Sequence, residues 1–69
     1  MELKEVLKAN KGHLVVMLGD IEDLNSSDIE ELLIKGHHLD GTAYEYAVNE
    51  LGIDTYDIMY HPSTDSWGF

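Results

Sequence analysis

GHLVVMLG, at residues 12–19, contains the longest unbroken run of apolar residues in this 69-residue chain. Five apolar residues lie between two glycines, with the β-branched Val15 and Val16 at the centre. A short run of this kind is typical of a strand buried on both faces, because a buried helix needs a longer run. The stretch therefore predicts a central strand over residues 13–18, on which the rest of the chain packs.

Apolar residues at helical spacing precede this strand. Leu3, Val6 and Leu7 recur with the period of a helix and predict one over residues 2–10. Gly12 follows, and glycine readily adopts the left-handed geometry that ends a helix. A helix thus leads directly into the strand.

A second helix is predicted after an acidic connector at residues 19–24. Asn25 is a suitable N-cap, and Ser27 with Glu30 forms a competing capping box. The helix runs to Lys35, because Gly36 is a typical terminator. Its start is therefore ambiguous by two residues, but its end is well defined.

A third helix is predicted over residues 42–51, ending at Gly52. Thr42 with Glu45 forms its capping box. Small residues at two inward positions of this helix permit a close approach to its neighbour. The connector before it, which includes two adjacent histidines, carries no strand or helix signal.

The last third of the chain has the pattern of a β-hairpin. Residues 53–60 read as a strand, Pro62 marks a turn, and residues 66–69 read as a short returning strand. A four-residue loop at 62–65 pairs Tyr60 with Trp67 across the two strands, and aromatic pairs of this kind stabilise a hairpin. The complete order is α-β-α-α-β, with a short final β. We therefore predict a single small α+β domain over residues 1–69, with three helices packed on a two- or three-stranded sheet.

Charge is the most distinctive property of the composition. Fourteen acidic residues face four lysines, and the formal net charge is −10. Three of the lysines lie within residues 1–11, so residues 12–69 hold twelve acids and Lys35 alone. Binding to phosphates or to anionic membranes needs basic residues, so both are disfavoured. A basic protein is the natural partner, since opposite potentials steer association, although acidity can also serve solubility alone.

Residues 42–58 resemble the helix–turn–helix family. A small residue at Ala43 or Ala47, the turn Leu51-Gly52-Ile53 and the later Ile58 match its pattern, and the element order is similar to that of a winged helix. The resemblance implies a recognition helix that carries arginine, lysine or glutamine to DNA. In this alternative residues 54–60 form a helix and not a strand. Either this helix or the one over residues 42–51 would present Glu45, Glu50, Asp54 and Asp57 instead. A scaffold of this type used for protein contacts is therefore the alternative prediction.

No cofactor, metal or catalytic centre is predicted. Cysteine is absent, which excludes disulfides and thiolate zinc sites. His37, His38 and Asp40 lack the spacing of a closed metal site, so the histidines are predicted to lie at the surface. The acids at 20, 22 and 31 match part of a calcium loop, but the glycine that such a loop needs is missing. The first eleven residues have too little hydrophobic length for a secretory signal, and a cytoplasmic location is expected.

These observations favour a non-enzymatic, acidic protein-binding domain. Its size and charge are similar to those of phage-encoded inhibitors that occupy nucleic-acid-binding surfaces. The predicted partner-binding residues are the acids of two segments together with one exposed tyrosine. They are Asp20, Glu22, Asp23, Asp28, Glu31, Glu45, Tyr46, Glu50, Asp54 and Asp57.

A homodimer is the second expectation, because a domain this small is only marginally stable alone. Ile34 falls beside Glu30, away from the apolar stripe of its helix, so it is predicted to be exposed. Trp67 is the other predicted anchor, because aromatic residues are enriched in interfaces. Ile34, Trp67 and the edge of the sheet are the candidate dimer contacts.

Overall fold

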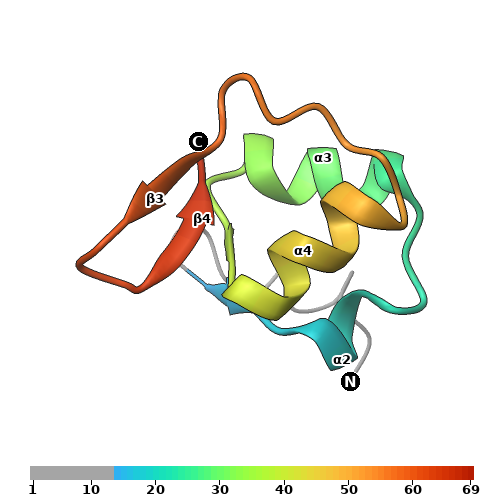
Figure 1. The fold of residues 1–69 in the computed structure, drawn as a ribbon, viewed down its shortest axis with the longest axis horizontal. Coiled ribbons are helices and arrows are strands. Elements are labelled where there is room, and N and C mark those ends of the chain that lie inside the picture. The colour runs from blue at the N-terminus through green and yellow to red at the C-terminus, as the bar shows by residue number, and fades with distance from the viewer. Residues whose placement is uncertain (1–13) are drawn as a thin grey trace.

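The computed structural model describes residues 14–69, and the helix predicted over residues 2–10 lies outside them. Residues 14–69 form a small α+β domain, which is the fold class that the sequence predicts. These residues hold three helices, one of them (α2, Leu18–Ile21) not predicted, and four short strands instead of the two or three expected. The strands belong to one mixed sheet with the order β1-β2-β4-β3. Figure 1 shows the helices gathered at one end of the molecule and the β3–β4 hairpin at the other.

The predicted central strand is the part of the fold that sequence reasoning placed wrongly. β1 spans Val15–Val16 only, and it lies at the edge of the described sheet rather than at its centre. Met17 is 59% exposed, and the helix α2, Leu18–Ile21, begins directly after it. The apolar run is thus shared between a strand and one helical turn, which bury different residues.

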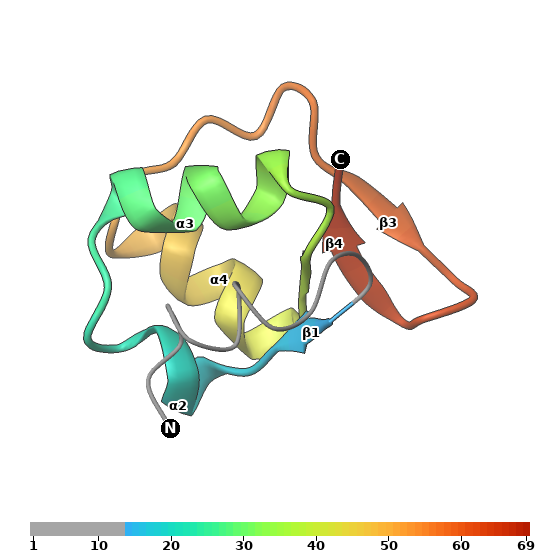
Figure 2. The ribbon, with the colours of Figure 1, turned by 180° about the vertical axis from the view of Figure 1, so that it is seen from behind.

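The strand missed by the sequence is β2, His38–Leu39. It pairs in parallel with β1 and in antiparallel with β4, so it lies inside the sheet. Both of its residues are buried. Figure 2 shows the α2 and α3 segments connecting β1 to β2, which is the crossover that a parallel pair requires.

The helix α3, Ser26–Ile34, begins at the N-cap predicted from Asn25. The Asn25 side chain accepts a hydrogen bond from the backbone amide of Asp28 at 2.9 Å. The competing start at Ser27 is therefore not used. Gly36 follows the helix with φ of 93°, the left-handed conformation expected of a glycine terminator.

The helix α4, Gly41–Asn49, begins earlier than predicted. Asp40, rather than Thr42, is its N-cap, and the Asp40 carboxylate accepts hydrogen bonds from the Ala43 amide at 2.6 Å and from the Thr42 hydroxyl at 2.9 Å. A carboxylate is as good a cap as a hydroxyl, so the local signal was ambiguous. Ala43 and Ala47 are fully buried, as their inward positions predict.

The C-terminal hairpin is confirmed, although its first strand is shorter than predicted. β3 spans Met59–His61 and β4 spans Ser66–Gly68, with Tyr60 opposite Trp67. Residues 53–58 are irregular rather than extended or helical. The second helix of a helix–turn–helix unit is therefore absent there, and the resemblance ends at the turn after α4.

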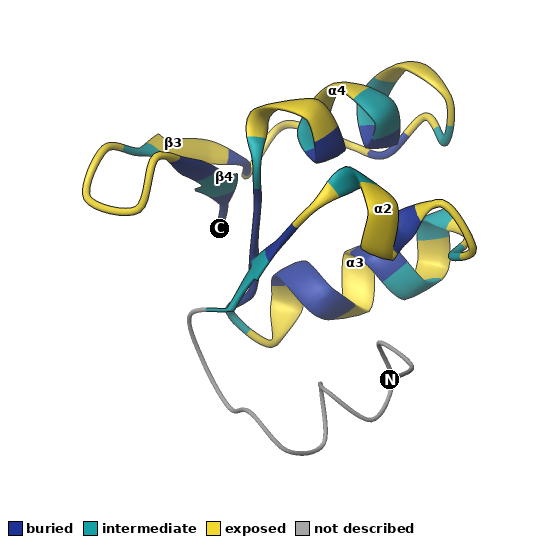
Figure 3. Ribbon diagram, turned by 90° about the horizontal axis from the view of Figure 1, so that it is seen from below, coloured by how far each residue is buried: buried dark blue, intermediate teal, exposed yellow. Residues whose placement is uncertain are grey.

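The core lies between the helices and the sheet. Figure 3 shows buried residues on the facing sides of α3 and α4 and along the strands between them. The fully or almost fully buried apolar residues are Val16, Ile21, Ile29, Leu32, Leu33, Leu39, Ala43, Ala47, Ile53 and Ile58. None of the helices in the described part of the chain is long and apolar enough to cross a membrane.

Candidate functional site

The carboxylates of the described residues lie at the surface. Ten of the twelve acidic residues between positions 14 and 69 are exposed, and Asp28 and Asp40 are half-buried. Lys35 is the single lysine or arginine in this part of the chain, and its ammonium group lies 3.1 Å from Glu31. Among residues 14–69, most of the carboxylates are therefore presented to solvent without a basic side chain beside them.

Some of these carboxylates hold local structure. Asp20 accepts a hydrogen bond from the Met17 amide at 3.4 Å, and Asp54 accepts one from the Tyr56 amide at 2.9 Å. Asp65 accepts a hydrogen bond from the Tyr60 hydroxyl at 2.5 Å. This bond is the main reason why the pKa of Tyr60 is raised above its ordinary value of 10.0. Substituting these acids would therefore alter local hydrogen bonds as well as the charge.

Five other predicted acids make no such contact. Within residues 14–69, no hydrogen bond or ion pair engages the carboxylates of Glu22, Asp23, Glu45, Glu50 or Asp57. Glu22 and Asp23 follow α2 directly, Glu45 lies in α4 and Glu50 follows it, and α2 packs on α4. In Figure 1 the turn after α2 and the C-terminal end of α4 lie at the same end of the molecule. We call Glu22, Asp23, Glu45 and Glu50 the α2–α4 acidic surface.

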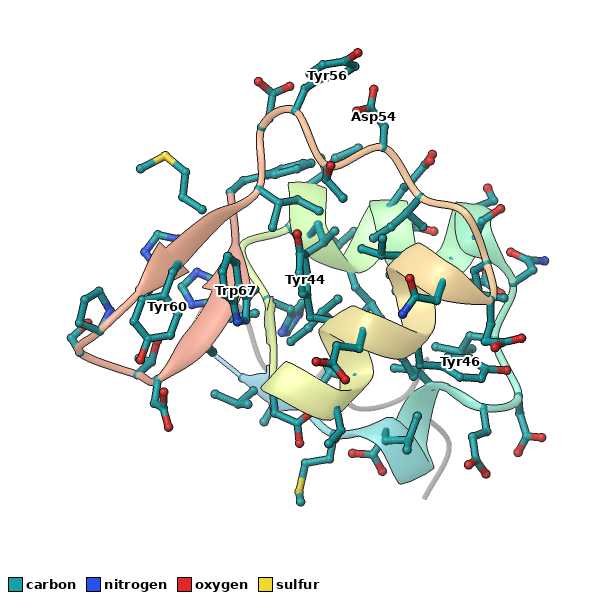
Figure 4. All side chains as sticks on the ribbon, in the orientation of Figure 1. Tyr44, Tyr46, Asp54, Tyr56, Tyr60 and Trp67 are labelled. Atoms are coloured by element: carbon teal, nitrogen blue, oxygen red, sulfur yellow. The ribbon has the colours of Figure 1, made fainter. Side chains whose placement is uncertain are left out.

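The remaining predicted acids lie elsewhere. Asp28 and Glu31 belong to α3, whereas Asp54 and Asp57 lie in the segment that joins α4 to β3. Asp54 points outward from this segment in Figure 4. The ten predicted residues therefore occupy three parts of the surface rather than one.

The two aromatic residues predicted as exposed anchors are half-buried. Tyr46 packs against the core, and Figure 4 shows its ring directed towards the turn after α2. Trp67 lies between two other rings: it stacks on Tyr44 of α4 with centroids 4.5 Å apart, and it meets Tyr60 at 5.2 Å. Both rings stabilise the contacts between elements, so neither is a free anchor.

Ile34 is exposed as predicted, with 73% of its surface accessible. Its neighbours on the outer side of α3, Glu30 and Glu31, are also exposed. A two-fold interface centred on Ile34 would bring these acids close to the same acids of a second copy. Like charges then oppose the small gain from one apolar side chain. The homodimer stays a prediction, and this surface does not favour it.

Contrary to the sequence prediction, His37 and His38 are buried. His38 belongs to a cluster of polar side chains on one face of the sheet. Its Nδ1 lies 3.2 Å from the Ser66 hydroxyl and 3.4 Å from that of Thr64, and its ring stacks on His61 with centroids 4.3 Å apart. His61 in turn donates a hydrogen bond from Nε2 to the Gly68 carbonyl at 3.1 Å.

This histidine–hydroxyl cluster consists of His38, His61, Thr64 and Ser66. Ser66 is completely buried, and its hydroxyl lies 2.5 Å from that of Thr64. The polar atoms are satisfied by one another, as buried polar groups must be. Within residues 14–69 no three histidine, aspartate or glutamate side chains are placed to hold a metal ion. The cluster therefore joins β2 to the hairpin.

His37 gives a testable pH dependence. Burial lowers its pKa below the ordinary 6.5, nearby Lys35 lowers it further, and a hydrogen bond with the Leu14 backbone opposes these effects. Its Nδ1 has no hydrogen-bond partner among residues 14–69. The unfolded chain thus binds a proton more readily than the folded one, and we expect stability to fall as the pH drops below about 6.5.

The measurement is the free energy of unfolding in urea between about pH 7.5 and pH 5.5, where histidines titrate and carboxylates do not. His37→Leu removes the titrating group, so we expect its stability to depend less on pH than that of the unsubstituted protein. The same pH dependence in both proteins would show that His37 is not responsible.

The comparisons with known proteins identify no relative of this chain. No protein-family model, curated protein or solved structure matches the chain. The function is therefore inferred from the charge, the exposed groups and the sheet.

Proposed function

We propose that this chain is a non-enzymatic binding domain that presents its carboxylates to a basic surface of another protein. One observation carries the proposal: among residues 14–69, ten exposed acids face one lysine, which is itself paired with Glu31. Such a field raises the rate of association with a cationic partner and disfavours nucleic acids. The cytoplasm is the proposed location.

The α2–α4 acidic surface is the best-supported part of the interface. Its four carboxylates have no hydrogen-bond or ion-pair partner within residues 14–69, which supports their use in contacts with another protein. The half-buried Tyr46, next to Glu45 in α4, supplies apolar area without needing to be ordered on binding. The finer proposal is that the partner's basic surface normally holds nucleic acid, and that this chain acts as an inhibitor by occupying it.

The first experiment identifies the partner. Tagged protein is incubated with a cell lysate, and the captured proteins are eluted in steps of rising salt and identified by mass spectrometry. We expect a basic protein to elute at moderate salt, because contacts between exposed charges are screened. Duplex DNA added in excess should release the same protein. A captured protein that stays bound in high salt would contradict a charge-based interface.

A pair of matched variants then tests the surface itself. Neutralising all four residues, with Glu22→Gln, Asp23→Asn, Glu45→Gln and Glu50→Gln, should weaken binding about tenfold or more and reduce its salt dependence. The control exchanges Asp and Glu at the same four positions and keeps every charge. Binding of the control should be almost unchanged. Equal affinity of the neutralised variant would overturn the proposed interface.

A further inference from the structure

The strand β3 ends the described sheet on the side opposite β1. It pairs with β4, and no strand among residues 14–69 pairs with its other side. In an antiparallel pair, alternate residues direct their backbone N–H and C=O groups away from the partner strand. β3 therefore offers backbone hydrogen-bonding groups to an added strand, which is a common mode of peptide recognition.

Exposed apolar side chains surround this edge. Tyr56 is 94% exposed, and Met59, Phe69 and Tyr60 are 63%, 46% and 43% exposed. Figure 4 shows Tyr56 pointing into solvent just before β3 and Tyr60 on the hairpin itself. On an ordinary surface, exposed apolar residues are scattered singly. Here four large ones are grouped within one short segment and the adjoining C-terminus.

Among residues 36–69, the charged side chains are all acidic. Asp54, Asp57 and Asp65 are exposed near the aromatic residues, and residues 36–69 contain no lysine or arginine. Aromatic faces and carboxylates both attract guanidinium and ammonium groups. A second copy of this chain would bring the same acids together at a shared edge. The charge therefore favours a cationic strand over a second copy.

We propose that the β3 edge binds an extended segment rich in arginine or lysine, which adds to the sheet as a fifth strand. This inference rests on the proposed function and names the form of the partner: a basic segment in extended conformation. Its backbone pairs with β3. Its cationic side chains contact Tyr56 and Tyr60 and the carboxylate of Asp57.

The test uses two synthetic peptides with the same sequence and charge. The first alternates arginine and threonine over nine residues, and the second carries N-methyl groups on alternate backbone amides of the face that would pair with β3. Binding to the full chain is measured by fluorescence anisotropy. We expect the unmodified peptide to bind and the methylated peptide to bind about tenfold more weakly, because it cannot form the inter-strand hydrogen bonds.

A pair of methionine variants locates the site. Met59→Lys adds a positive charge at the edge, whereas Met17→Lys adds the same charge at a residue of similar exposure before α2. Met59→Lys should weaken peptide binding about fivefold or more, since lysine on an edge strand opposes pairing with a cationic strand. Met17→Lys should change it by less than about twofold, because its charge is distant and screened.

The outcomes separate this inference from the proposed function. Equal binding of both peptides, reduced only by neutralising the α2–α4 acidic surface, would overturn the edge site and leave the proposed function standing. Failure of both peptides to bind, together with capture of no basic protein from the lysate, would overturn both. A dimer that Met59→Lys converts to a monomer would overturn the cationic strand in favour of a second copy.

Discussion

Leu39→Ala is expected to destabilise the protein by about 2–5 kcal/mol, the usual cost of removing a buried leucine side chain. Leu39 lies on β2, is fully buried and faces Trp67 across the sheet. It belongs to the core that joins the strands to the helices. A domain of this length has a total stability of only about 3–10 kcal/mol, so this one change is expected to leave much of the protein unfolded.

The measurement is the urea midpoint followed by circular dichroism, with Leu39→Met as the variant that should remain folded. A swap of similar volume usually costs less than about 1.5 kcal/mol. Ile34→Ala is the surface control, because the exposed Ile34 has little packing to lose. A Leu39→Ala protein as stable as the Ile34→Ala control would mean that β2 is not part of the stabilising core.

Local chemistry made much of this fold predictable. The start of α3 follows from the Asn25 cap, and its end follows from Gly36, because these signals act through neighbouring backbone groups. The hairpin follows from the turn at Pro62, and the turn sets the register that places Tyr60 opposite Trp67. In each case the interacting groups are close in sequence, so the sequence pattern contains the information.

The sheet could not be predicted in the same way. β2 is two residues long, which gives no periodicity, and its pairing partners come from β1 and β4, which are distant in the chain. His38 looked like a surface residue because its partners, Ser66 and Thr64, lie 26 or more positions later. The strand predicted from the apolar run at residues 14–18 was too long, because the amino acids of this run suit both a strand and a short helix.

The candidate site was also only partly predictable from the sequence. The charge of the candidate site follows from the composition alone. Charged side chains are rarely buried, so the exposure of Glu22, Asp23 and Glu50 was also expected. The aromatic residues needed tertiary information: Trp67 is held by the stack with Tyr44, which comes from α4. The exposure of Tyr56 was not predicted either, because residues 53–58 read as a strand but fold as an irregular segment.

Gly68→Ala is the second large effect, expected to destabilise the protein by about 1–3 kcal/mol through overpacking. A methyl group at position 68 would collide with the His38 ring, meeting its Cδ2 directly and lying 3.0 Å from Cγ. The ring is fixed by the stack with His61 and by the hydrogen bond with Ser66. It therefore has little freedom to move, and β4 must shift instead.

The matched control is Gly19→Ala. Gly19 lies in α2 with nothing within 4 Å of the added methyl group, so alanine should stabilise the helix by up to about 1 kcal/mol. The two glycine substitutions thus have opposite expected signs, which urea denaturation resolves directly. Gly68→Ala with a stability equal to or above that of the unsubstituted protein would rule out the close contact with His38.

A double-mutant cycle with His38→Ala identifies the cause of the Gly68 effect. Removing the imidazole creates the space that the new methyl group needs, so the double variant should lose less stability than the two single variants together, by about 1 kcal/mol or more. Additive losses would place the strain elsewhere on β4. A favourable coupling would instead establish that the histidine–hydroxyl cluster is closely packed, and that glycine at position 68 is required because the His38 ring occupies the position of its missing side chain.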